Sequence, residues 1–242
     1  LNDAAALRGL VHQVLLMVDL GDLREGVWGS DLVGLYEFTQ TLTNISIWGI
    51  GTNMACLSGE SPQVADYEHL AELIRNLDRS SLNYPLMISG GNSSALHLMR
   101  LGHWRGPSTS IVNNLRIGES AFLGWDIIDQ TPLPGCCQDV CQLVAEVIEV
   151  QTKPTDRGPR RRAILAIGRQ DLGGGQIWPL WPRASVVGIT SDHLVLDVED
   201  VPGIFVGSLV PFAVDYDALL GLFTSQYVEK KHVFNIAVKE SL

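Results

Sequence analysis

The sequence has few charged residues and very few lysines. Only 18% of its 242 residues are Asp, Glu, Lys or Arg, and its lysines are Lys153, Lys230, Lys231 and Lys239. The longest apolar runs fall well short of 18 residues, which excludes an ordinary membrane-spanning helix. Acidic residues outnumber basic ones by 27 to 17, which argues against a nucleic acid as partner. We expect a protein that binds neither membranes nor nucleic acid, and the lack of a signal-peptide pattern predicts a cytoplasmic location.

Cysteine is also scarce, with Cys56 alone and a group of Cys136, Cys137 and Cys141. Their spacing fits no paired C-x-x-C zinc framework, and no histidine near the group would complete four ligands. A chain of this length needs no disulfides to hold a core. We therefore expect reduced thiols and no metal site.

Apolar residues make up 46% of the chain, and in the first half they form short continuous runs between amphipathic stretches. Runs that are apolar throughout and alternate with helices are typical of parallel strands buried on both faces. The pattern predicts strands at 14–18, 45–50, 85–88 and 111–115. It predicts helices from an N-cap at Ser30 or Asp31 to Leu42, over 64–77 and over 95–101.

Each predicted strand is followed by a loop rich in Gly, Asn, Ser or Arg. In β/α arrays the functional groups gather at the carboxyl ends of the strands. These loops span residues 19–26, 49–56, 89–94 and 113–120, so a binding or catalytic site is expected there.

The pattern changes near residue 125. Residues 130–140 are rich in Pro, Gly and Cys and predict a linker. Strands are expected at 143–150, 163–167, 186–198 and 204–212, with a closing helix over 216–223. The basic run Arg157–Arg162 adjoins a Pro/Gly turn and is interpreted as a solvated hairpin tip. We predict an α/β domain at 1–128 and a small, mostly antiparallel β domain at 129–242.

Six segments in order resemble one known family. They are MVDLGDLREG at 17–26, GIGTNMAC at 49–56, SGGNSS at 89–94, NNLRIGE at 113–119, SDHLVLD at 191–197 and the stretch 212–220. The chain resembles the alanine/ornithine racemase family of fold-type III pyridoxal-phosphate enzymes, and the first and third segments are closest to the ornithine racemase form. The resemblance implies an amino-acid racemase acting on ornithine or a similar basic amino acid, otherwise on alanine. It also implies a (β/α)8 TIM-like barrel, the cofactor pyridoxal 5'-phosphate and a homodimer with shared active sites.

The resemblance further implies which residues bind the cofactor. Ser93 matches the family's phosphate-binding serine, aided by the amides of Gly118 and Glu119, and Tyr216 matches a tyrosine that reaches the same phosphate. Arg116 matches the arginine that faces the pyridine nitrogen, where a permanent charge keeps that nitrogen unprotonated. Asn53 stands where alanine racemases have a stacking histidine. The expected cofactor-binding residues are Asn53, Asn92, Ser93, Ser94, Arg116, Gly118, Glu119 and Tyr216.

For the substrate, the resemblance implies contacts from Arg24, Ser191 and Asp192. The family's second acid/base is a tyrosine, and this chain has Gly168-Arg169-Gln170-Asp171-Leu172 at that place. The opposite-face acid is therefore another group, with Asp171, Asp192 and His193 as candidates. Asp22, Glu25 or Asp192 are candidates to receive the distal ammonium of a basic substrate.

None of the four lysines matches the family lysine that bonds covalently to the cofactor. We therefore expect that this chain lacks the N-terminal half of the barrel and is inactive by itself. An alternative is a non-catalytic cofactor-binding or interaction protein, or an inactive fragment, without that lysine. Another reaction on the same fold, such as an aldolase or dehydratase reaction, is a further alternative.

Overall fold

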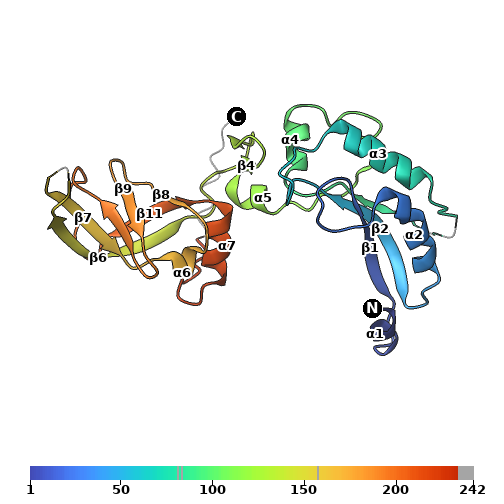
Figure 1. Ribbon diagram of the computed structural model, residues 1–242, viewed down its shortest axis with the longest axis horizontal. Coiled ribbons are helices and arrows are strands. Elements are labelled where there is room, and N and C mark those ends of the chain that lie inside the picture. Colours follow the sequence, from blue (N-terminus) through green and yellow to red (C-terminus); the bar gives the residue numbers. More distant parts are fainter. Residues whose placement is uncertain (81, 83, 157, 234–242) are drawn as a thin grey trace. The chain divides into compact units, whose positions relative to one another are not determined.

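The computed structural model describes residues 1–80, 82, 84–156 and 158–233. The chain divides into two compact units, Leu1–Gln138 and Asp139–Leu242, which are described in turn (Figure 1). Among the described residues, no helix combines the length and apolar character needed to cross a membrane.

The first unit is built on a three-stranded parallel sheet in the order β1-β2-β3. The strands are β1 (His12–Asp19), β2 (Ile45–Asn53) and β3 (Met87–Ser89), and the short helix α1 (Asn2–Ala6) precedes them. Three of the four expected strands are thus confirmed. The register pairs Asp19 with Asn53 and Gly51 with Ser89, so the carboxyl ends of the strands lie along one edge of the sheet.

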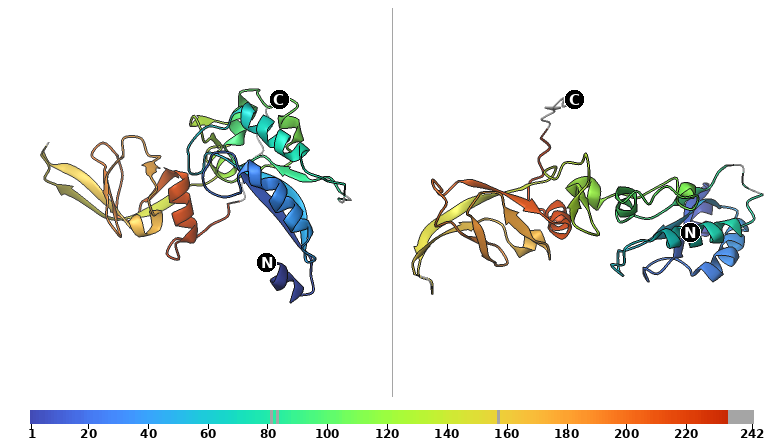
Figure 2. Two further views of the ribbon diagram at one scale, coloured as in Figure 1. Left: turned by 45° about the vertical axis from the view of Figure 1, so that its right-hand side comes forward. Right: turned by 90° about the horizontal axis from the view of Figure 1, so that it is seen from above.

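Two helices cover one face of this sheet (Figure 2). They are α2 (Leu32–Gln40), which follows the 3-10 turn η1 (Gly29–Asp31), and α3 (Val64–Arg75). Asp31 lies at the N-cap of α2 but makes no capping hydrogen bond with its side chain, unlike the cap expected there. The core between helices and sheet contains Leu16, Val18, Leu32, Tyr36, Ile47, Ile50, Leu70, Ile74, Leu77, Leu86 and Ile88.

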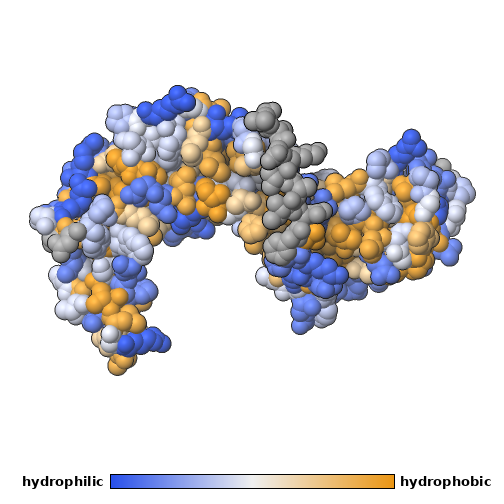
Figure 3. All heavy atoms as spheres, turned by 180° about the vertical axis from the view of Figure 1, so that it is seen from behind, coloured by the Kyte–Doolittle hydropathy of each residue, from blue (hydrophilic) through white to orange (hydrophobic). Residues whose placement is uncertain are grey.

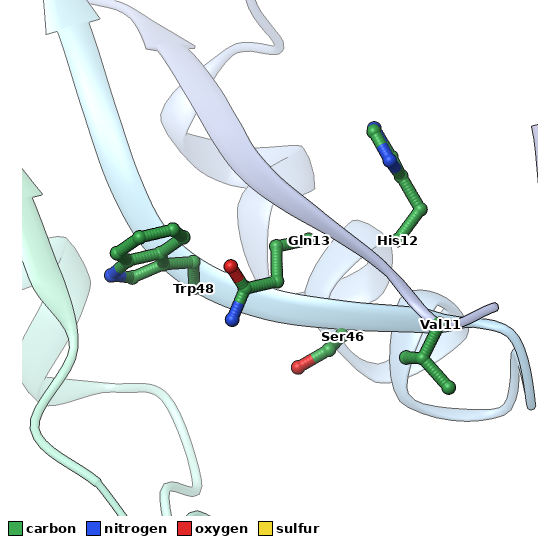
Figure 4. Close-up of a pocket in the computed structure, with 5 residues that line it drawn as sticks. All are labelled: Val11, His12, Gln13, Ser46 and Trp48. Atoms are coloured by element: carbon green, nitrogen blue, oxygen red, sulfur yellow. The ribbon is translucent and has the colours of Figure 1, made fainter.

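Apolar side chains stay exposed elsewhere on the first unit. They gather over α1, where Leu1 and Leu7 face solvent (Figure 3). On the sheet, Trp48 on β2 is 44% exposed. It lies with Gln13 and Ser46 on one side of β1 and β2 (Figure 4), beside a shallow hollow of about 540 Å³ lined by Val11, His12, Gln13, Ser46 and Trp48.

The prediction of a fourth strand at 111–115 is wrong. This segment starts at the last residue of the 3-10 turn η2 (Thr109–Ile111) and forms a single parallel bridge, between Ser89 and Asn114. The side chain of Asn113 takes the place of a strand neighbour, because its Oδ1 accepts from Ile88 N at 2.8 Å and its Nδ2 donates to Leu86 O at 3.1 Å. Backbone bonds from Asn113 N and Asn114 N to Ile88 O, and from Gly90 N to Asn114 O, complete the contact with β3, so the edge is satisfied by side-chain and main-chain groups together and not by a regular ladder.

The first unit ends later than the expected boundary after residue 128. Following α4 (Ala95–Arg100) and α5 (Glu119–Leu123), β4 (Trp125–Asp126) and β5 (Thr131–Pro132) form a small hairpin. The Asp126 side chain is fully buried, accepts from Arg100 Nε at 2.7 Å and lies 3.0 Å from His97 Nδ1. This ion pair holds the hairpin to α4, so most of the expected linker 130–140 belongs with the first unit.

The second unit is a six-stranded, antiparallel sheet in the order β8-β11-β6-β7-β10-β9. The predicted antiparallel β fold is therefore confirmed, although the strand expected over 186–198 is two strands joined by a turn. The elements are β6 (Leu143–Lys153), β7 (Arg160–Leu165), α6 (Arg169–Leu172), β8 (Ile177–Pro179), β9 (Ser185–Ile189), β10 (Leu194–Asp197), β11 (Leu209–Val214) and α7 (Tyr216–Thr224).

The arginines of the run 157–162 lie in β7 rather than at a hairpin tip, apart from Arg157, which is outside the described residues. Arg160 forms a bidentate ion pair with Asp197 at 2.9 Å. Arg161 donates to the carbonyl of Ile204 at 2.6 Å. These arginines are bonded within their own unit, where they stabilise the neighbouring loops.

Candidate functional site

The candidate site of the first unit lies at the carboxyl edge of the parallel sheet. Asp19, Asn53 and Ser89 are the last residues of β1, β2 and β3, and all three are largely buried. The polar loops that follow these strands begin at this edge, as expected for a β/α array.

Arg116 joins the ends of β2 and β3. Its Nη2 donates to the carbonyl of Thr52 at 2.9 Å and to Asn53 Oδ1 at 3.4 Å, and its Nη1 donates to Ser89 Oγ. Its backbone N–H donates to Gly91 O at 2.9 Å. The guanidinium is thus fixed by three acceptors on two strands, and it brings a permanent positive charge to this edge.

Asn92 is the centre of a second network, beside Arg116. Its Nδ2 lies 2.9 Å from each of three acceptors, Asn53 Oδ1, Met54 O and Cys56 Sγ. Its Oδ1 accepts from Ser94 N at 2.8 Å, which begins the turn into α4. Because Asn53 Oδ1 accepts from both Asn92 and Arg116, the two networks share an atom. The structure therefore brings together Asn53, Asn92, Ser94 and Arg116 of the expected cofactor set.

Ser93 precedes α4 in the chain, and its hydroxyl contacts the start of α5. Its side chain is buried, and its Oγ accepts from the backbone N–H groups of Gly118 at 3.3 Å and Ser120 at 3.2 Å. The hydroxyl of Ser120 is buried and makes no hydrogen bond among the described residues, and the same is true of Thr52 Oγ1. Glu119 is the first residue of α5. Hydroxyl and backbone N–H groups, which are common anion ligands, thus gather near Ser93, and in this structure the two N–H groups donate to Ser93 itself.

A glycine allows this loop to pack closely. A Cβ atom at Gly90 would lie 2.6 Å from Val112 Cγ1, a distance that real Cβ contacts do not show. The carbonyl of Gly90 accepts from the buried hydroxyl of Tyr67 at 2.9 Å. Burial is the main cause that raises the pKa of Tyr67, so this hydroxyl stays a hydrogen-bond donor at neutral pH.

Arg24, the expected substrate contact, lies in the loop after β1. Its guanidinium forms an ion pair with Glu25, with Nε 2.6 Å from Oε2, and its Nε lies 3.7 Å from Asp22 Oδ2. Burial by itself raises the pKa of Asp22, but donors from Leu57 and Ser58, together with Arg24, lower it overall. Asp22 is therefore an anion beside Arg24 at neutral pH.

The other expected site residues belong to the second unit, where Asp171 has structural partners. Its side chain is only 3% exposed, and its Oδ1 accepts from Ser225 Oγ at 2.7 Å. Its Oδ2 lies 3.4 Å from Gly168 N, where it caps α6. Both carboxylate oxygens of Asp171 thus hold α6 and the end of α7 in place.

Ser191, Asp192 and His193 form the exposed turn between β9 and β10. Ser191 Oγ donates to Asp192 Oδ2 at 3.0 Å, and His193 N donates to Thr190 Oγ1 at 3.1 Å. Tyr216 begins α7 and is half-buried. The side chains of Ser191, Asp192 and His193 are therefore accessible at the surface of the second unit.

Three residues that the sequence analysis did not single out form hydrogen bonds within the site. Ser89 and the Thr52 carbonyl hold Arg116, and Cys56 accepts from Asn53 Nδ2 at 3.2 Å as well as from Asn92. All three lie inside the segments that carry the family resemblance, so their position was visible. Their partners were not, because a main-chain carbonyl has no signature in a sequence.

One cluster with metal-ligating atoms lies outside this network. Within the described ranges, one side-chain atom each from His97, Asp126 and Asp129 lie within 4.8 Å of one another. Arg100 is bonded to both carboxylates. Its guanidinium already supplies the positive charge that a cation would bring, so the cluster serves the packing of the hairpin onto α4.

Comparisons with known proteins agree with this geometry. The family model described as "Alanine racemase, N-terminal domain" matches residues 1–124. Ornithine racemase of Acetoanaerobium sticklandii is 36% identical over 252 residues, covering 96% of this chain and 70% of that protein. Lysine racemase of Thermotoga maritima is 35% identical over 236 residues, covering 90% and 65%.

Solved structures show the same fold at low sequence identity. D-threonine aldolase from Filomicrobium marinum matches with a TM-score of 0.68 at 16% identity, covering 91% of this chain and 59% of that one. Alanine racemase from Bartonella henselae with covalently bound pyridoxal phosphate matches with a TM-score of 0.61 at 18% identity, covering 87% and 60%. The chain belongs to the alanine racemase family, and it spans between 59% and 70% of the length of these four proteins.

The residues of the first unit suit the phosphate and the ring of the family's cofactor, but they include no group for its covalent attachment. The orphaned hydroxyl of Ser120, the Ser93 hydroxyl and the nearby backbone donors suit a phosphate, and the fixed guanidinium of Arg116 suits an unprotonated ring nitrogen. Residues 1–138 contain no lysine, so this unit offers no side-chain amine for a covalent bond. The fit therefore concerns the phosphate and the ring, not the covalent attachment.

Proposed function

We propose that the protein is a pyridoxal-phosphate-dependent racemase of a basic amino acid, ornithine or lysine. The observation that carries this proposal is the joined network of Arg116, Asn53 and Asn92 at the carboxyl edge of the parallel sheet. The two curated relatives, an ornithine racemase and a lysine racemase, support the substrate class. The same proposal takes the three parallel strands as part of a (β/α)8 barrel.

Pyridoxal phosphate supplies, when bound, the electron sink for the carbanion formed at the substrate Cα. Ser93 and Ser120 would hold the phosphate, together with the amides of Gly118 and Glu119 and the hydroxyl of Tyr216. Arg116 would face the ring nitrogen and keep it unprotonated, because a guanidinium never gives up its proton in proteins. A weaker sink favours simple return of the proton over side reactions.

Arg24 would bind the substrate carboxylate, and Ser191 and Asp192 would contact the substrate from the second unit. Among the candidates for the second acid/base, Asp171 is the weakest, because both of its oxygens are engaged in structural bonds. Asp192 and His193 lie exposed on a turn, where they are free to approach a substrate. We assign the role of second acid/base to one of these two residues.

The proposal includes a cytoplasmic homodimer whose subunits share their active sites. In such a dimer the turn at Ser191–His193 of one subunit would reach the site of the other, which explains functional side chains at the surface of the second unit. Cross-linking combined with analytical ultracentrifugation of the full-length protein tests this part directly. A monomer at micromolar concentration would contradict it.

Racemisation is tested by incubating the full-length protein with pyridoxal phosphate and L-ornithine, L-lysine or L-alanine. The D-enantiomer is then measured by chiral chromatography. We expect faster conversion of the two basic amino acids than of alanine. The proposal fails if no amino acid is converted faster than by the free cofactor.

One observation favours a second candidate, a cofactor-binding protein without racemase activity, namely the lack of lysine in residues 1–138. Borohydride reduction of the purified 242-residue chain with pyridoxal phosphate separates the two. We expect no stable adduct on this chain alone. An adduct mapped to Lys153, Lys230, Lys231 or Lys239, the last outside the described residues, would contradict the view that the covalent anchor lies elsewhere.

A further inference from the structure

Asp22 joins the loop after β1 to the loop after β2. Its side chain is 3% exposed. Its Oδ1 accepts three hydrogen bonds, from Leu57 N at 3.0 Å and from Ser58 N and Ser58 Oγ at 3.1 Å each. One carboxylate oxygen thus fixes two consecutive residues of a loop that lies 35 positions further along the chain.

The other oxygen of Asp22 faces Arg24. Asp22 Oδ2 is buried without a hydrogen bond among the described residues, and Arg24 Nε lies 3.7 Å from it. This distance is too long for a hydrogen bond but within the range of an ion pair, and the guanidinium, which is half-exposed, makes its shorter ion pair with Glu25 at 2.6 Å. A buried oxygen that already faces a cation is a poor receptor for a substrate ammonium. The role of Asp22 as a distal-ammonium receptor, one option from the sequence, is therefore replaced by a role toward Arg24.

Both loops that Asp22 joins contain a non-glycine residue with left-handed backbone. Leu23 has a φ of 59°, and Ala55 has a φ of 64°. Such conformations are unfavourable for residues with a Cβ, and they persist only where the surroundings impose them, most often at functional sites. Asp19 supplies such a contact at Leu23, because its Oδ1 accepts from Leu23 N at 3.2 Å, and Asp22 holds Leu57 and Ser58, which follow Ala55 in the chain.

The loop fixed by Asp22 leads directly to the network at the sheet edge. Cys56 precedes Leu57, and its Sγ accepts from Asn53 Nδ2 and Asn92 Nδ2. A continuous set of hydrogen bonds therefore runs from Asp22 through this loop to the residues that hold Arg116, and Arg24 joins it through its charge contact with Asp22.

We propose that Asp22 is a positioning residue, which fixes Arg24 as the anchor for a substrate carboxylate and fixes the loop 55–58 beside it. The assignment of Arg24 to a carboxylate rests on the proposed function. The clamp between Asp22 and the loop rests only on the contacts above. The two parts thus have separate tests.

The first test is kinetic and uses the full-length protein with pyridoxal phosphate. Asp22→Asn keeps an oxygen for Leu57 and Ser58 but removes the charge that faces Arg24. We expect the KM for the amino acid to rise by about tenfold or more while kcat changes by less than about threefold, because a substrate-binding contact is lost. The exposed neighbour Glu60→Gln is the control and should leave both unchanged. An unchanged KM in Asp22→Asn would overturn the role toward Arg24.

The second test needs no activity. Hydrogen exchange of the Leu57 and Ser58 amides is compared between the wild type and Asp22→Ala, with Asp22→Asn as the conservative rescue. We expect about tenfold faster exchange or more at these two amides in Asp22→Ala, and largely restored protection in Asp22→Asn. Equal protection in the wild type and Asp22→Ala would overturn the clamp. If the wild type racemises no amino acid, the proposed function fails while this exchange experiment still decides the clamp.

Discussion

Arg116 donates from Nη2 to the main-chain carbonyl of Thr52 at 2.9 Å, across 64 positions of sequence. The same guanidinium reaches Ser89 at the end of β3. A residue that follows an irregular segment is thus held in place by two strands of the sheet. Its charge is positioned by the fold before any ligand arrives, which lowers the cost of ordering a binding site.

Arg116 is the residue whose replacement should change the reaction, not only its rate. In the proposed function Arg116 faces the ring nitrogen of the cofactor, so Arg116→Gln would remove that cation, allow the nitrogen to be protonated and strengthen the electron sink. We expect the ratio of racemised product to side products to fall. Arg116→Lys keeps the charge but loses the planar fork, and we expect a rate loss of about 10²-fold with less change in that ratio.

Chiral product analysis with quantification of side products measures this prediction. Arg105→Lys serves as a matched control, because Arg105 is an exposed arginine of the same unit. Equal product ratios in the wild type and Arg116→Gln would contradict the role assigned to the guanidinium.

Asn92 should contribute to stability as well as to the site. Asn92→Ala removes the Asn92 side chain as acceptor for the amide of Ser94 and as one of two side-chain donors to the carbonyl of Met54, the other being Ser94 Oγ at 3.3 Å. We expect the free energy of unfolding to fall by about 1–3 kcal/mol, as is usual when buried polar groups lose a partner. Denaturant titration measures the effect, with the exposed Asn76→Ala as control. A change as small as that of the control would show that water replaces these bonds at no cost.

The strands of the first unit were predictable because β1 and β2 are continuous apolar runs with polar loops after them. The failure at 111–115 has a specific cause. The Asn113 side chain takes the donor Ile88 N and the acceptor Leu86 O that a neighbouring strand would use, so the main-chain bonds of this segment to β3 are those at Ile88 and Gly90. An apolar pattern in the sequence indicates which residues are buried. It does not indicate which groups form hydrogen bonds with the backbone of the adjacent strand.

The site was predictable in its residues but not in its bonds. The family segments pointed to Asn53, Asn92, Ser94 and Arg116, which the structure joins in one network. The clamp made by Asp22 was not visible, because its partners are backbone amides in a distant loop. Propensity and motif spacing carry no information about such long-range main-chain contacts.

Asp126 gives the first unit a pH-dependent contribution to stability. Burial by itself raises the pKa of Asp126, but the bonds from Arg100, Ile128 N and His97 lower it overall. The carboxylate therefore stabilises the folded state above the pKa of an unfolded aspartate, and this stabilisation is lost as the pH falls through the lowered folded-state pKa. We expect the difference in unfolding free energy between the wild type and Asp126→Asn to be constant above about pH 5 and to shrink below about pH 4.

Urea titrations of both proteins across the acidic range measure this difference. Asp129→Asn is a useful comparison, because Asp129 contacts the same Arg100 from an exposed position. A difference between wild type and Asp126→Asn that stays constant down to pH 3 would show that the buried pair does not control acid stability.

Variants of Asp171 and of the turn residues Asp192 and His193 should show which of these residues stabilises the second unit and which transfers a proton. Asp171→Ala removes the cap of α6 and the acceptor of Ser225, so we expect a loss of about 1–2 kcal/mol in unfolding free energy. The pH dependence of kcat should keep its shape, because Asp171 does not transfer a proton in the proposed mechanism.

His193→Ala and Asp192→Asn leave the fold intact, since both side chains are exposed on a turn. One of these two variants should lose most of kcat and one limb of the pH profile. If Asp171→Ala alters the profile while both turn variants leave it unchanged, the second acid/base is Asp171 and the assignment to the turn is wrong.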